Sequence, residues 1–85
     1  MITKLYKVYA DYCGPCKQLS KELEGINVPI EPINAEENDD FTLNYNIRGI
    51  PVLIFMDGDK EIYRHVGLMT HKDIQSKIDE LNETS

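Results

Sequence analysis

The first ten residues alternate between two sets of side chains that favour β-structure. In residues 2–10, Leu5, Lys7 and Tyr9 fall on one side, and the residues between them fall on the other. Alternation over this length is typical of a β-strand with two distinct faces. We therefore predict a strand over residues 2–10.

A helical spacing of apolar residues follows this strand. Cys16, Leu19 and Leu23 stand at positions i, i+3 and i+7, which lie on one face of an α-helix. Gly25 comes just after the last of them, where helices commonly end. The spacing predicts a helix over residues 14–24 that buries one stripe of side chains.

The middle of the chain carries two weaker patterns. Residues 28–34 are apolar and contain two prolines, which suit an edge strand or a strand start better than a central strand. Residues 36–45 begin with acidic side chains and place Phe41 and Tyr45 four positions apart. Acidic residues favour the positive end of a helix, so a strand followed by a helix is predicted here.

The next segment has the pattern of a β-hairpin. An apolar run covers residues 52–56, Asp57 and Gly58 form a turn signal, and an alternating stretch continues to Val66. Two strand-like runs joined by an Asp-Gly pair are a strong hairpin signal. We predict two antiparallel strands.

The chain closes with an amphipathic helix. Thr70 and Asp73 have the spacing of a capping box, and the apolar residues Ile74, Ile78 and Leu81 follow at helical intervals. Residues 82–85 are expected to fray. The predicted order is therefore β-α-β-α-β-β-α.

This order predicts an α/β fold in one domain over residues 1–85. A strand, helix and strand in succession imply a parallel crossover, whereas the hairpin adds antiparallel strands. The result is a four-stranded mixed sheet with three helices packed over it. The sequence contains no internal repeat and no linker.

Composition and charge exclude several classes of function. The formal net charge is −6 and the nine basic residues are scattered, whereas binding to nucleic-acid phosphates requires clustered Lys and Arg. No apolar run approaches the roughly 20 residues that span a bilayer. The first residues lack the apolar core of a secretory signal. We expect a cytoplasmic monomer that binds neither nucleic acid nor membrane.

The two cysteines, in "DYCGPCKQL", allow three interpretations. A structural disulfide between Cys13 and Cys16 would close a very small loop, which constrains the unfolded chain little. A zinc site needs four ligands, and His65 and His71 do not have finger-like spacing from the pair. A metal shared between two chains remains open, as does a pair of thiols that carries out chemistry.

The third interpretation has a physical mechanism. Cys13 stands at the predicted helix start, where unpaired N–H groups and the helix dipole stabilise a thiolate. Cys16 is one turn away and could attack a mixed disulfide on Cys13. Gly14 removes side-chain bulk beside the nucleophile, and Pro15 suits the first helical turn. Lys17 could add favourable charge or could simply be solvated.

Three motifs together resemble the thioredoxin family. "YCGPCK" follows a strand, "RGIPVLIF" comes about 35 residues later, and "VG" precedes the last helix. The resemblance implies a thioredoxin-like fold, with Cys13 as nucleophile and Cys16 as resolving thiol. It also implies a cis peptide bond before Pro51 that faces the cysteines and puts Pro51 in contact with the sulfurs. A backbone at Ile50 that pairs with substrate, and docking roles for Pro51 and Gly67, are implied as well.

The sequence departs from the family pattern in three places. It begins at what would be the family's central strand, so its size and element order resemble those of a glutaredoxin. Tyr12 replaces the usual Trp, and Lys7 replaces a usually buried Asp. Either the Lys7 ammonium lies near the thiols and favours thiolate, or its side chain turns to solvent.

The resemblance implies a protein disulfide reductase that takes electrons from a thioredoxin-reductase-type donor. It implies no bound cofactor, because the redox group is the Cys13–Cys16 pair. A glutathione-dependent glutaredoxin is a second interpretation, although "VGLMTHKD" lacks the double glycine typical of glutathione sites. A non-enzymatic interaction subunit with this fold and a dimer that shares a metal also remain open.

Overall fold

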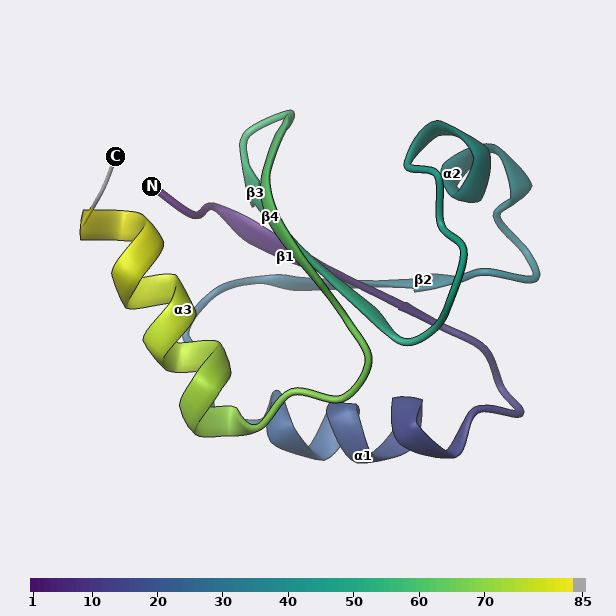
Figure 1. Cartoon of the computed structure of the whole chain (residues 1–85), viewed down its shortest axis with the longest axis horizontal. Coiled ribbons are helices and arrows are strands. Elements are labelled where there is room, and N and C mark those ends of the chain that lie inside the picture. The colour runs from purple at the N-terminus through teal and green to yellow at the C-terminus, as the bar shows by residue number, and fades with distance from the viewer. Residues whose placement is uncertain (84–85) are drawn as a thin grey trace.

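The computed structural model describes residues 1–83 and has the predicted order of elements (Figure 1). The elements are β1 (Lys4–Tyr9), α1 (Gly14–Glu22), β2 (Ile30–Asn34), α2 (Asp39–Asn44), β3 (Val52–Asp57), β4 (Lys60–Val66) and α3 (His71–Glu83). The α/β fold class predicted from the sequence is confirmed.

The strands form one mixed sheet in the order β2-β1-β3-β4. β1 pairs in parallel with β2 and antiparallel with β3, while β3 and β4 form the antiparallel hairpin. β2 therefore lies at an edge, where a proline costs little because its missing N–H can face away from the ladder. Pro32 of β2 is in register with Lys7 of β1.

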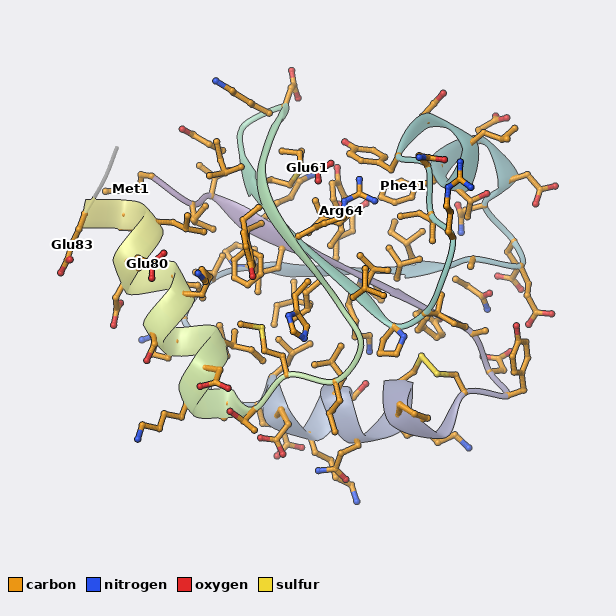
Figure 2. The ribbon with its side chains drawn as sticks, in the orientation of Figure 1. Met1, Phe41, Glu61, Arg64, Glu80 and Glu83 are labelled. Atoms are coloured by element: carbon orange, nitrogen blue, oxygen red, sulfur yellow. A yellow bond between two sulfur atoms is a disulfide. The ribbon has the colours of Figure 1, made fainter. Side chains whose placement is uncertain are left out.

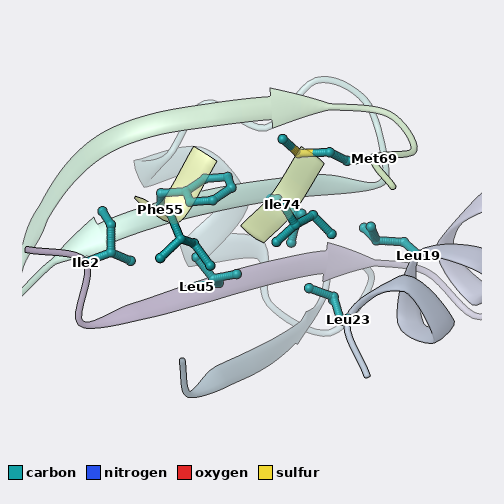
Figure 3. Close-up of a cluster of buried hydrophobic side chains, with 9 residues drawn as sticks. Ile2, Leu5, Leu19, Leu23, Phe55, Met69 and Ile74 are labelled. Atoms are coloured by element: carbon teal, nitrogen blue, oxygen red, sulfur yellow. The ribbon is translucent and has the colours of Figure 1, made fainter. Parts of the chain in front are cut away.

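Helices cover both faces of the sheet. In Figure 1, α1 and α3 lie on one face and α2 lies on the other. The first face carries the larger buried cluster, shown in Figure 3, which contains Ile2, Leu5, Leu19, Leu23, Leu53, Phe55, Met69, Ile74 and Ile78. Because helices pack on both sides of it, β3 is apolar and buried at every position from Val52 to Met56.

An aromatic cluster attaches α2 to the second face. The Tyr6 ring of β1 lies 4.9 Å from the ring of Phe41, which stacks at 4.4 Å on Tyr45. Arg64 of β4 donates a 2.8 Å hydrogen bond to the carbonyl oxygen of Tyr45 and also pairs with Glu61. Figure 2 shows Arg64 and Glu61 beside Phe41. The short α2 is thus held mainly by side chains from the sheet.

α2 is shorter than the predicted helix over residues 36–45. Residues 35–37 form a turn instead. The N–H of Glu36 donates to Asn34 Oδ1 at 3.0 Å, and Asn38 Nδ2 donates to the Asn34 carbonyl at 2.8 Å. Such local side-chain bonds compete with helical ones, so the helix begins only at Asp39.

The expectation that residues 82–85 fray is wrong for Asn82 and Glu83, which belong to α3. Asn82 Oδ1 accepts a 2.7 Å hydrogen bond from the N–H of Ile2. At the other end of α3, the N–H of Asp73 donates to Thr70 Oγ1 at 3.2 Å, as the capping signal predicted. Residues 84–85 lie outside the described residues. Within residues 1–83, no helix is long and apolar enough to cross a membrane.

We expect Leu19→Ala to lower the free energy of unfolding by about 2–5 kcal/mol, because Leu19 is fully buried between α1 and the sheet. Lys21→Ala, on the exposed side of the same helix, is the control and should change it by less than about 0.5 kcal/mol. Urea unfolding of both variants measures the difference. Equal stabilities would mean that α1 does not depend on this packing.

Candidate active site at the start of α1

Both cysteines lie where β1 gives way to α1. Cys13 is the N-cap of α1 in an extended conformation, and Cys16 lies in the first helical turn. The two sulfurs form a disulfide, visible as the yellow bond beside α1 in Figure 2. Cys13 is 7% exposed and Cys16 is 3% exposed, so Cys13 is the more accessible of the two.

The backbone of this loop directs a donor at the first sulfur. The N–H of Cys16 lies 3.1 Å from Cys13 Sγ, in a buried position. The first turn of α1 contains no acidic residue that would oppose a negative charge on the sulfur. Because an unpaired N–H and the helix dipole both stabilise negative charge, the site favours thiolate at Cys13 in the reduced chain.

Gly14 and Pro15 fit the loop for different reasons. Pro15 is in the first turn, where its missing N–H has no intrahelical partner to lose. A Cβ added to Gly14 would meet no atom within 4 Å other than those of its two chain neighbours and the backbone of its own helix. Packing within the chain therefore does not require glycine at this position.

The loop before β3 approaches the cysteines from a distant part of the sequence. The Ile50-Pro51 peptide bond is cis, as the family resemblance implied. Ile50 packs against the buried cluster of Ala10, Cys13 and Cys16. The suggested contact between Pro51 and the sulfurs stays a prediction.

Gly67, which follows β4, is hydrogen-bonded to the loop before β3. Its N–H donates a 2.8 Å hydrogen bond to the carbonyl oxygen of Pro51, and its φ of 102° is one that glycine adopts without strain. Tyr12 is 77% exposed and Val66 is 62% exposed, so large apolar side chains reach solvent near these segments.

Lys7 points toward α1. Its Nζ donates a 2.6 Å hydrogen bond to Ser20 Oγ, which in turn donates to the carbonyl oxygen of Cys16 at 3.2 Å. Partial burial lowers the pKa of Lys7 from its ordinary value, because desolvation disfavours the charged amine. The amine therefore lies against α1, and the closeness of the Lys7 ammonium to the thiols stays a prediction.

Ser20 was not predicted as part of this site. It follows Cys16 by four residues, the spacing at which a helical serine hydroxyl can reach a backbone carbonyl. The four-residue spacing of Cys16 and Ser20 could therefore have indicated this hydrogen bond from the sequence. The pairing with Lys7 on β1 depends on how the helix sits on the sheet, which local spacing does not report.

The histidines have structural contacts of their own. His65 Nε2 lies 3.0 Å from the carbonyl oxygen of Leu68, and His71 Nδ1 lies 2.9 Å from that of Glu22. His71 thereby ties the start of α3 to the end of α1. Within residues 1–83, no group of three or more His, Cys, Asp or Glu side chains could hold a metal ion.

Comparison with known proteins gives a consistent result. Residues 2–80 match the thioredoxin family model. The chain is 34% identical over 83 residues to a thioredoxin of Chlorobaculum thiosulfatiphilum, a match that covers 89% of this chain and 76% of the relative. It is 33% identical over 70 residues to Thioredoxin-T of Drosophila melanogaster, which covers 75% of this chain but only 45% of that protein.

Solved structures agree. A mutant thioredoxin from Halobacterium salinarum aligns with a TM-score of 0.83 at 27% identity, over 91% of this chain and 72% of the solved one. The fold predicted from the order of elements and the family suggested by the three motifs are both confirmed.

We expect the reduced chain to be alkylated first at Cys13 at neutral pH. Cys13 is the more accessible cysteine and the one whose sulfur receives the backbone N–H. A brief treatment with iodoacetamide followed by peptide mass spectrometry measures the order of labelling. Faster labelling of Cys16 would reverse the roles of the two thiols, and the urea-unfolded chain, in which both should react alike, is the control.

Proposed function

Because the chain belongs to the thioredoxin family, we propose that it reduces disulfide bonds in proteins with electrons from a thioredoxin-reductase-type donor. Family membership and the Cys13–Cys16 disulfide make it a thiol–disulfide oxidoreductase. The redox group is the chain's own cysteine pair, and thioredoxins need no cofactor. We infer that the cytoplasm is the compartment in which the chain meets both its protein substrates and its electron donor.

The observation that carries the proposal is the position of Cys13. Its sulfur caps α1 and lies 3.1 Å from the N–H of Cys16, so the same helical turn supplies both the stabilising donor and the second thiol. A purely structural disulfide does not require a backbone donor directed at one of its sulfurs. A nucleophile that must be regenerated depends on it.

The reaction consists of two exchanges. The Cys13 thiolate attacks one sulfur of the substrate disulfide, and the substrate's S–S bond breaks as its first thiolate leaves and takes a proton from water. Cys16, after losing its proton, attacks Cys13 Sγ and expels the second substrate thiolate, which is also protonated. Two electrons have then moved to the substrate, and the chain holds the Cys13–Cys16 disulfide.

The loop before β3 offers the substrate a backbone to pair with. Ile50 packs against the cysteine cluster, and Gly67 fixes the neighbouring segment through its bond to the Pro51 carbonyl. An extended substrate segment could add to this edge as a short strand, which would align its disulfide with Cys13. This mode suits a protein substrate better than a small thiol.

We expect insulin disulfides to be reduced when NADPH and thioredoxin reductase supply electrons, and little turnover when glutathione and glutathione reductase replace them. Cys13→Ser should be inactive with either donor, since it removes the attacking sulfur. Turnover supported only by glutathione would contradict the proposal and favour a glutaredoxin. No turnover with either donor would favour an interaction subunit.

We expect Cys16→Ser to accumulate a mixed disulfide between Cys13 and substrate, because the first exchange can occur and the second cannot. Non-reducing electrophoresis after mixing with a disulfide-containing protein measures the adduct. The double variant Cys13→Ser/Cys16→Ser is the control and should give none. An adduct that forms equally well in Cys13→Ser would show that Cys16 is the nucleophile.

A further inference from the structure

We propose that Lys7 is a positioning residue for the second exchange, in which its ammonium stabilises the thiolate of Cys16. Lys7 takes no part in bond making and transfers no proton. The role of Cys16 as the resolving thiol rests on the proposed function. The effect of the Lys7 charge on the Cys16 thiol can be measured whether or not that function holds.

Two contacts hold the amine of Lys7 against α1. Ser20 Oγ accepts its 2.6 Å hydrogen bond, and the Tyr9 ring lies 5.1 Å away, within the range of a cation–π contact. Because Ser20 also donates to the Cys16 carbonyl, the amine is tied to the same helical turn as the second thiol. Because a hydrogen bond and an aromatic contact both hold the Lys7 amine, it differs from a lysine that only water contacts.

Lys7 and Cys16 both line one open pocket of about 270 Å³. It lies between the end of β1, the first turns of α1 and the β2 edge, and is lined by Lys7, Tyr9, Ala10, Asp11, Cys16, Lys17, Ser20 and Pro32. Cys16 contributes to this lining and Cys13 does not. We therefore infer that the charge of Lys7 affects the second thiol more than the first.

The other charged groups of the pocket do not cancel the field of Lys7. Lys17 adds a second positive charge from α1, and Asp11 adds one negative charge from the β1–α1 loop. The side chain that β2 contributes is the uncharged Pro32. Two amines and one carboxylate leave a positive balance near Cys16, and charge interactions are stronger in a partly buried site than in bulk water.

A thiolate is required at Cys16 when the mixed disulfide is to be resolved. Cys16 releases its proton to water, its sulfur bonds to Cys13 Sγ, and the bond between Cys13 and the substrate sulfur breaks. The leaving substrate thiolate takes up a proton from water, so protons and electrons balance. A nearby ammonium lowers the free-energy cost of removing the proton from Cys16.

The test measures the Cys16 thiol directly. In a Cys13→Ser background, Cys16 is the only thiol in the chain, and its ionisation can be followed by the ultraviolet absorbance of the thiolate. We expect Lys7→Met to raise the pKa of Cys16 by about one unit. Lys7→Arg should keep most of the wild-type value because it keeps the charge. Lys21→Met, which removes an exposed lysine from the same helix, should leave it unchanged.

A kinetic measurement separates charge from structure. With both cysteines present, stopped-flow release of a coloured thionitrobenzoate group from Cys13 reports the second exchange. At neutral pH we expect Lys7→Met to slow this release about threefold, since a tenfold loss of thiolate is partly offset by its higher nucleophilicity. The slowing should disappear at high pH, where Cys16 is fully ionised. A structural defect would slow release at every pH.

An unchanged Cys16 pKa in folded Lys7→Met overturns the inference, and so does Lys7→Arg behaving like Lys7→Met. If circular dichroism shows that Lys7→Met does not fold, Ser20→Ala replaces it, because it frees the amine without altering β1. In Ser20→Ala the pKa of Cys16 should rise by less than in Lys7→Met. An unchanged Cys16 pKa in Ser20→Ala would also contradict the inference. A different result is that the Cys16 pKa shifts as expected in Lys7→Met although thioredoxin reductase cannot reduce the wild-type chain. That result would contradict the proposed function and leave this inference standing.

Discussion

The packing of α1 on the sheet is the constraint on which the active site depends. Leu19 and Leu23 are buried with Leu5 of β1 and Ile74 of α3, and this stripe fixes both the position and the rotation of the helix. Cys16 belongs to the same stripe, one turn earlier, so it faces inward. Cys13 is then left at the helix start, where backbone donors meet its sulfur. The hydrophobic core thus turns Cys16 inward and leaves Cys13 at the helix start.

The same constraint explains how two distant segments complete the site. The β1 strand alternates, so Leu5 and Lys7 face α1 while Tyr6 and Val8 face α2. Lys7 reaches the turn of Cys16 through Ser20, and Ile50 reaches the cysteines from the loop that precedes β3. Lys7 stands where the family resemblance would place a buried acid, and its amine is hydrogen-bonded to Ser20 of α1. The chain therefore combines a family scaffold with local electrostatics of its own.

Periodicity in the sequence predicted most of the fold, because each long element has one face that must be buried. The alternation in β1, the stripe in α1 and the Thr70 cap of α3 all reported real packing or hydrogen bonding. Prediction failed where a few polar groups decide the outcome. Asn34 holds a turn in place of the first part of the predicted second helix, and Asn82 is ordered by a residue 80 positions away. The partner of Lys7 was missed for the same reason, since Ser20 meets it only after α1 has docked.

The start of α1 is expected to stabilise a thiolate at Cys13 in the reduced chain. The most direct test is to follow the Cys13 thiol of the reduced wild-type chain by NMR, with its Cβ carbon labelled, as the pH is changed. We expect Cys13 to lose its proton at a pH clearly below the value of about 8.5 found for free cysteine. A Cys13 that ionises at or above that pH would contradict it, because the 3.1 Å approach of the Cys16 N–H would then give the sulfur no advantage.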